Sequence, residues 1–130
     1  MYEIKKTPYG IHVTMGGLYE ENEIEEYIAE KENLLSEIDG SYSMIIDLRT
    51  AIPPKHEDAQ RLKESQEKMK DSKMHRMAII VSSPVIMNQA KQISFLSELD
   101  SSTKYIDSSK TDNWEEVALQ WISESSKVKH

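Results

Sequence analysis

Met44-Ile45-Ile46 and Met77-Ala78-Ile79-Ile80-Val81 are two uninterrupted apolar runs, and they decide the fold class of this sequence. Runs without polar alternation are typical of strands that other elements cover on both faces. The segment between them, residues 55–71, has the spacing of a polar helix with a thin apolar stripe. A helix between two such strands favours parallel pairing, so the sequence predicts an α/β sheet with helices packed on it.

The residues before the first run predict an antiparallel hairpin. Thr7-Pro8-Tyr9-Gly10 has the composition of a turn, and it separates a short mixed segment, residues 2–6, from residues 11–15. Residues 11–15 alternate apolar and polar side chains, as strands with one buried face do. We expect this pair to form an antiparallel edge on a mixed central sheet.

The remaining segments complete the order of elements. Residues 20–38 have helical spacing, and Ser83-Pro84 opens another helix as its N-cap and first position. Lys104-Tyr105-Ile106 is a short strand, and Asp112 with Glu115 resembles a capping box before the last helix. The predicted order is therefore β-β-α-β-α-β-α-β-α.

Length and composition bound the domain organisation and the chemistry. The chain has 130 residues, which suits one domain, and we assign residues 1–122 to it and residues 123–130 to a polar tail. Cysteine is absent, which excludes a disulfide framework, a thiolate metal site and a cysteine nucleophile. No apolar run approaches the ~20 residues of a membrane span, and the start resembles no signal peptide, so we expect a cytoplasmic protein.

The net charge of −7 is unevenly distributed along the chain. Residues 1–50 hold 11 acidic and 4 basic residues, whereas residues 51–92 are mildly basic. The acidic balance argues against a protein that binds duplex nucleic acid or anionic membranes. It does not exclude a small anionic ligand near the basic segment.

Three local motifs, together with the order of elements, resemble the SpoIIAA-like branch of the STAS family, which is related in fold to SEC14-type lipid-binding domains. They are Gly17-Leu18 before an acidic helix, Ile45-Ile46-Asp47-Leu48-Arg49 at a strand end, and Tyr105-Ile106-Asp107 followed by Trp114 to Ile122. The resemblance implies a STAS-like fold. It also implies a non-catalytic regulatory or binding module that contacts a protein partner or holds a small, apolar or lipid ligand.

The classical phosphoserine switch of STAS antagonists is not carried over. The resemblance places an Asp-Ser-Ser-Gly motif after the third strand, where this sequence has no serine and Thr50 is the nearest hydroxyl. Asp107-Ser108-Ser109-Lys110 matches in part, but it follows a different strand and has lysine in the glycine position.

Polar residues at predicted strand ends form the candidate rim of a binding site, because ligands in open α/β sheets bind beyond the carboxyl ends of strands. An anion could bind at the helix start beside Ser82 and Ser83, with Lys91 two turns further on. The structural alternatives are that Asp47 pairs with Arg49 or caps a backbone amide, and that Ser83 is a plain N-cap. The candidate rim comprises Asp47, Arg49, Thr50, Ser82, Ser83, Lys91 and Asp107.

Recognisable catalytic and metal-binding motifs are missing from the sequence. The four histidines have no metal-ligand spacing, and no serine lies in a nucleophile elbow, so we expect no metal, no cofactor and no enzymatic activity. Methionines around the polar helix, Met69, Met74, Met77 and Met87, indicate either core filling or an apolar pocket beneath that helix.

Two alternatives to the binding module stay open. One is a phosphotransfer protein or small-molecule enzyme that uses the rim around Asp47. The other is a structural homodimer subunit that pairs through a sheet edge or through the last helix.

Overall fold

The computed structural model describes residues 1–70 and 72–124, and its centre is a five-stranded sheet in the order β1-β2-β3-β4-β5. β1 and β2 are antiparallel, and each later pair of neighbours is parallel. The predicted fold class and element order are confirmed. Most of the predicted polar tail, residues 125–130, lies outside the described residues. The strands are β1 (Tyr2–Thr7), β2 (Gly10–Gly17), β3 (Tyr42–Ala51), β4 (Met74–Val81) and β5 (Thr103–Asp107).

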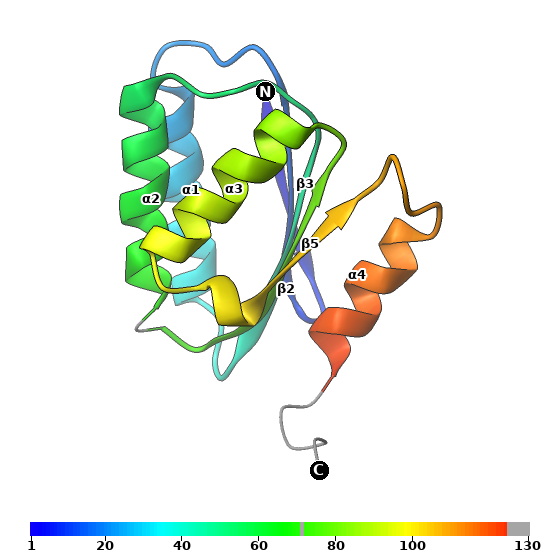
Figure 1. The fold of residues 1–130 in the computed structure, drawn as a ribbon. Coiled ribbons are helices and arrows are strands. Elements are labelled where there is room, and N and C mark those ends of the chain that lie inside the picture. Colours follow the sequence, from blue (N-terminus) through cyan, green and yellow to red (C-terminus); the bar gives the residue numbers. More distant parts are fainter. Residues whose placement is uncertain (71, 125–130) are drawn as a thin grey trace.

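Helices cover both faces of the sheet (Figure 1), three of them on one face and one on the other. The strands follow one another across the sheet in chain order, and right-handed crossovers therefore place every connecting helix on the same face. The last helix follows the final strand and is free to pack on the opposite face. The helices are α1 (Glu23–Ser36), α2 (His56–Met69), α3 (Pro84–Leu96) and α4 (Trp114–Ser123), with a short 3-10 turn, η1 (Asp100–Ser102), before β5.

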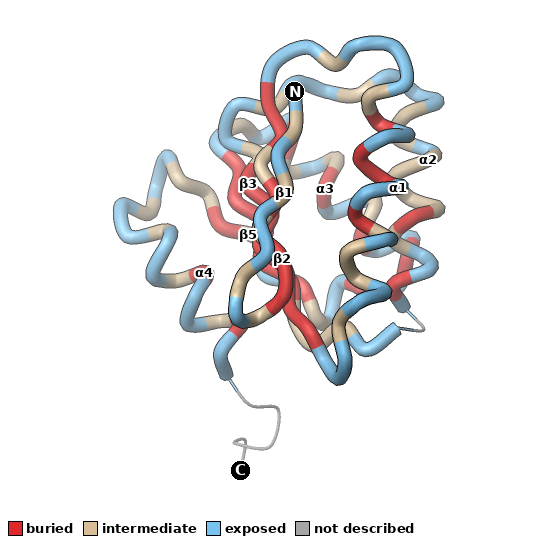
Figure 2. The backbone as a smooth tube through the Cα atoms, turned by 180° about the vertical axis from the view of Figure 1, so that it is seen from behind, coloured by how far each residue is buried: buried red, intermediate tan, exposed pale blue. Residues whose placement is uncertain are grey.

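The central strands contribute to two apolar layers, which explains their uninterrupted apolar sequences. Alternate residues of β3 and β4 face opposite sides, so Ile46 and Ile79 join the α1–α3 layer while Ile45 and Ile80 join the α4 layer. Figure 2 shows buried residues concentrated in the strands and on the inner sides of the helices. The smaller layer consists of Ile45, Ala78, Ile80, Ile106, Ala118 and Ile122.

The hairpin strands have one apolar and one polar face, as their alternation predicts. Ile11 and Val13 of β2 are fully buried beneath the helices, whereas His12 and Thr14 on the other face are half-buried. α4 contacts β3, β4 and β5 but has no comparable contact with the hairpin. The face that α4 leaves uncovered is therefore the polar one.

The structure confirms one predicted helix start and corrects two others. Ser83 caps α3, its hydroxyl accepting a hydrogen bond from the Val85 amide at 3.2 Å. α1 begins at Glu23 rather than at residue 20, after the left-handed Asn22. The capping box was wrong, because α4 begins after Asn113 and its start has no side-chain cap.

A glycine pair ends β2, which continues through Gly17, two residues beyond the predicted segment 11–15. A β-carbon at Gly16 would collide with the Thr50 hydroxyl of the neighbouring strand, so any larger residue there would require the Thr50 side chain to move. Gly17 has a φ of +67°, a conformation that glycine adopts without strain. The chain leaves the sheet only after this residue.

Candidate functional site

An apolar cavity lies between α2, α3 and the sheet face that these helices cover, and we call it the α2–α3 cavity. Its volume, measured as space for the centre of a water-sized sphere, is about 80 Å³. One water molecule needs only ~10–15 Å³ by this measure, so the cavity has room for part of a small molecule. Its apolar walls include Met15, Ile46, Leu48, Ala51, Ile79, Ile86, Ala90 and Ile93.

Four polar side chains interrupt this apolar lining. The side-chain carbonyl oxygens of Gln66 on α2 and Gln89 on α3 are shut off from solvent and accept no hydrogen bond from the described residues. Tyr19 and Tyr27 line the same cavity, and burial raises the pKa of both phenols, so both stay protonated at neutral pH. The cavity thus has hydrogen-bonding groups but no charged side chain in its lining.

The cavity lies at the carboxyl end of the parallel strands, the usual place for ligands in such sheets. Leu48 and Ala51 near the end of β3 form part of its wall, and Ile52 and Pro54 of the following segment border it. A second hollow, between the outer sides of α2 and α3, shares Pro54, Gln89 and Ile93 with the cavity. Ligands could therefore enter beside α2.

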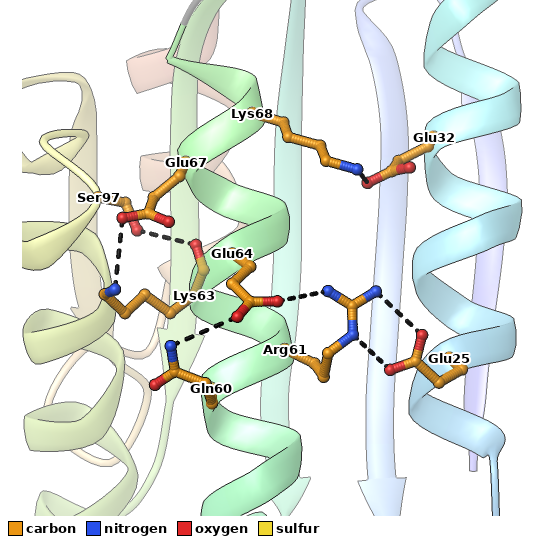
Figure 3. Close-up of polar contacts among 9 residues, drawn as sticks. All are labelled: Glu25, Glu32, Gln60, Arg61, Lys63, Glu64, Glu67, Lys68 and Ser97. Atoms are coloured by element: carbon orange, nitrogen blue, oxygen red, sulfur yellow. Dashed lines mark hydrogen bonds and ion pairs between the residues drawn. The ribbon is translucent and has the colours of Figure 1, made fainter.

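Ion pairs link α2 to its neighbour α1 (Figure 3). Arg61 donates hydrogen bonds to both carboxylate oxygens of Glu25, at 2.6 and 3.0 Å, and a third to Glu64 at 2.7 Å. Lys68 forms a longer pair with Glu32, 3.6 Å between nitrogen and oxygen. Met69 is the one buried apolar side chain of α2, whereas α1 and α3 each bury more than one, so α2 is the least firmly anchored of the three helices on this face.

The predicted rim residue Asp47 is bound by Arg49, on the face of the sheet that α4 covers. Both structural alternatives are confirmed: the Arg49 backbone amide donates to Asp47 Oδ1 at 3.0 Å, and its guanidinium donates to both carboxylate oxygens. Burial raises the pKa of Asp47, but the hydrogen bonds and charge of Arg49, with a contribution from His12, bring it below its usual value. Asp47 is therefore an ionised, fully engaged carboxylate.

Arg49 links this carboxylate to α4. Its guanidinium carbon lies 4.1 Å from the centre of the Trp114 ring, a cation–π contact. Asp107, at the end of β5, accepts hydrogen bonds from the backbone amide and hydroxyl of Ser109 at 2.9 and 2.5 Å. These hydrogen bonds lower the pKa of Asp107. The carboxylates of Asp47 and Asp107 are therefore both bound by residues two positions further along the chain.

The other predicted rim residues also lie apart from the cavity. Ser82 donates to the backbone oxygen of Arg49 at 2.8 Å, and Thr50 packs against Gly16. Lys91 lies with its ammonium 5.7 Å from the centre of the Tyr105 ring. The structure gives no contact that brings Lys91 to Ser82 or Ser83 within the described residues. None of the seven predicted residues lines the α2–α3 cavity.

The predicted pocket beneath the polar helix has the right position but a different lining. The cavity lies under α2, but none of the four predicted methionines lines it. The one methionine in its lining is Met15. Gln66 and Gln89 were not predicted from the sequence. The sequence holds one signal for these two residues. Each is an amide side chain on the apolar side of its helix, one turn after an apolar residue: Gln66 follows Leu62, and Gln89 follows Ile86.

Within residues 1–70 and 72–124, no group of three or more His, Asp or Glu side chains is arranged to hold a metal ion. None of the helices in the described ranges is both long and apolar enough to cross a membrane. No family model, curated protein or solved structure matches this chain.

Proposed function

We propose that this chain is a non-catalytic binding module that holds a small, uncharged, largely apolar molecule in the α2–α3 cavity. The observation that carries the proposal is the pair of buried carbonyl oxygens, of Gln66 and Gln89, in an otherwise apolar lining. A buried amide oxygen without a hydrogen bond costs ~1–3 kcal/mol. A ligand that donates an N–H or O–H group to these oxygens would recover that cost.

The chemistry of the lining defines the ligand class. No charged residue is present to compensate a charged ligand, so a charged group would remain unpaired in an apolar cavity. Small-molecule sites commonly combine apolar walls with a few polar groups that orient the ligand. A single aromatic ring or a short acyl chain with one N–H or O–H donor fits both the size and the polarity of the cavity.

The state of Asp47 favours this module over a phosphotransfer enzyme at the strand-end rim. A phosphoryl acceptor needs a free carboxylate oxygen, and both oxygens of Asp47 accept hydrogen bonds from Arg49. Transfer to Asp47 would first have to break this pair, which Trp114 covers. We therefore place the binding function in the α2–α3 cavity rather than at the rim.

A relationship to the SpoIIAA-like branch of the STAS family is part of the proposal. It is supported by the order of elements and by the strand-end motif around Asp47. A regulatory role, in which ligand occupancy alters contacts with a protein partner, follows from that relationship. The proposal for the ligand stands on the cavity alone.

Binding of indole tests the proposal, because indole is uncharged, aromatic and carries one N–H donor. Naphthalene is the matched ligand without a donor. We expect indole to bind more tightly than naphthalene in calorimetry. Filling the cavity with Ala90→Leu should abolish binding while raising the thermal midpoint, because Ala90 lines the cavity on α3 and leucine suits a helix.

The matched control is Ala29→Leu, the same change at an exposed position of α1. This variant should bind indole like the unmodified chain. Equal affinity of the Ala90→Leu variant for indole would overturn the proposal. Native mass spectrometry of the freshly purified chain would then show whether any ligand is retained elsewhere.

A further inference from the structure

Another hollow lies at the opposite end of the helix layer, between the C-terminal ends of α1 and α2, and we call it the α1–α2 groove. Its volume is about 610 Å³ by the same measure as the cavity. Residues from both helices line it, together with Tyr42 at the start of β3 and the residues that precede this strand. Unlike the cavity, it contains several charged side chains.

Lys31 is the most unusual of these. Its side chain lines the groove, yet the residue is only 2% exposed. Among the described residues, no carboxylate pairs with the Lys31 ammonium and no oxygen accepts a hydrogen bond from it. The ammonium instead makes a cation–π contact with the Tyr27 ring, whose centre lies 5.3 Å away. An ammonium carries three donors, and buried charges in proteins are normally paired.

Ser65 supplies a second unused donor in the same groove. The residue is 1% exposed, and its hydroxyl has no hydrogen-bond partner in the described part of the chain. Helical serines usually bond to solvent or to a carbonyl one turn back, and this one does neither. Two residues that line one hollow therefore carry buried donors without a hydrogen-bond partner, one of them positively charged. The Glu32 carboxylate oxygen Oε2 in the same hollow also accepts no hydrogen bond from the described residues.

We propose that the α1–α2 groove binds a small oxyanion, a carboxylate or phosphate group, through Lys31 and Ser65. Oxyanions are the natural complement because they offer several acceptor oxygens and a compensating charge. This site is separate from the α2–α3 cavity, so it does not rest on the function proposed above.

The other charges of the groove are compatible with an anion. Lys68 and Lys73 add two positive charges, and Glu32 and Asp39 add two negative ones. Glu32 Oε2 lies 3.6 Å from the Lys68 ammonium, an ion pair without a hydrogen bond, so Lys68 offsets part of its repulsion of an anion. With Lys31 counted, the groove has one positive charge in excess.

Protonation of Lys31 gives the binding a distinctive signature. Burial lowers the pKa of Lys31 to about 8, with Glu32 raising it and Lys68 lowering it to a smaller extent. An anion that stabilises the ammonium should therefore raise this pKa. Binding at pH 8 should draw protons from the buffer, which calorimetry in two buffers of different ionisation enthalpy detects.

Inorganic phosphate and acetate, each compared with chloride at constant ionic strength, test the proposal on the full chain. We expect phosphate or acetate to raise the thermal midpoint, with proton uptake at pH 8. Lys31→Met should weaken binding at least about tenfold and remove the proton uptake, since it deletes a charge-assisted hydrogen bond. Ser65→Ala should weaken binding but leave the proton uptake.

Lys5→Met is the matched control, because it removes the same charge from an exposed lysine outside the groove. It should respond to phosphate like the unmodified chain. An equal response of the Lys31→Met variant, or the absence of any response beyond that to chloride, would overturn the proposal. Ala90→Leu, which blocks the α2–α3 cavity, should leave the phosphate response unchanged.

Discussion

Lys31 gives the protein a stability that depends on pH in an unusual direction. Its pKa is about 8 in the folded chain against an ordinary 10.5, so between these values the unfolded chain binds a proton that the folded chain has released. Burying the charged Lys31 side chain lowers the free energy of unfolding. This destabilisation has its full size below pH 8 and disappears above the pKa of the unfolded chain. Without an anion, it amounts to about 3 kcal/mol, since each unit of pKa corresponds to ~1.4 kcal/mol.

We therefore expect the free energy of unfolding to rise by about 1–2 kcal/mol between about pH 8 and about pH 9.5. The measurement stops at about pH 9.5 because tyrosines with a raised pKa, such as Tyr2, lower the free energy of unfolding at higher pH. Lys31→Met should remove the rise and stabilise the chain at pH 7. Urea unfolding at each pH measures this, and a rise that persists in the variant would contradict it.

Asp47 is the opposite case, a carboxylate whose ionised form the fold stabilises. Its lowered pKa means that this stabilisation is present above the unfolded pKa and is lost as the pH falls through the folded pKa. We expect Asp47→Asn to lower the free energy of unfolding at pH 7 by about 1–2 kcal/mol, toward the lower end of the ~1.5–3 kcal/mol usual for hydrogen bonds to a charged group, because the Arg49 side chain is partly exposed.

The exposed Asp112 provides the control, because Asp112→Asn makes the same change without a buried pair. Urea unfolding at pH 7 should show no more than a small effect there. The same samples test the rejected role of Asp47: incubation with a phosphodonor and Mg²⁺ should leave the intact mass unchanged. A phosphoryl adduct that Asp47→Asn abolishes would contradict our placement of the function.

At the scale of elements, α2 governs access to the α2–α3 cavity. Exposed ion pairs contribute only ~0.2–1 kcal/mol each, so the contacts of Arg61 hold α2 against α1 weakly. We expect Arg61→Gln to speed amide hydrogen exchange of α2 by about 2–5-fold, with little change in α3. Molar salt should produce the same change in the unmodified chain and little further change in the variant.

Lys55→Gln is the matched control for this experiment, since Lys55 precedes α2, is exposed and forms no ion pair in the described part of the chain. It should exchange like the unmodified chain. Unchanged exchange in the Arg61→Gln variant would show that apolar packing, and not this ion pair, sets the opening of α2.

The elements themselves could be predicted from the sequence because local patterns determine them. The continuous apolar runs of β3 and β4 indicated burial on both faces, and Ser83-Pro84 marked the start of α3. The start of α4 was misassigned by one residue, because two neighbouring polar residues could both serve as the N-cap. Patterns of composition do not distinguish between such neighbours.

The site was less predictable because it depends on contacts between elements distant in sequence. Strand-end polarity led to Asp47 and Asp107, yet these charges are engaged by Arg49 and Ser109 only two residues away. The cavity arises where the side chains of α2 and α3 fail to fill the space above the sheet, and no local pattern encodes such a gap. A polar helix with a thin apolar stripe was the one usable signal.

At the scale of the whole molecule, the two apolar layers depend on each other because β3 and β4 supply residues to both. Undocking α4 would expose Ile45, Ala78 and Ile80 on the back of strands whose front packs against α1–α3. The sheet has no independent core on either side. We therefore expect the helices of both faces to unfold in a single transition.

Both tryptophans of the chain, Trp114 and Trp121, lie on α4, so tryptophan fluorescence reports on this helix alone. Trp121 donates a hydrogen bond to the Met77 backbone oxygen at 3.1 Å and stacks on Arg76, which couples its emission to docking on β4. Far-UV circular dichroism reports mainly on α1–α3, which contain most helical residues. The two signals should share one urea midpoint; a fluorescence change at lower urea would show that α4 undocks first.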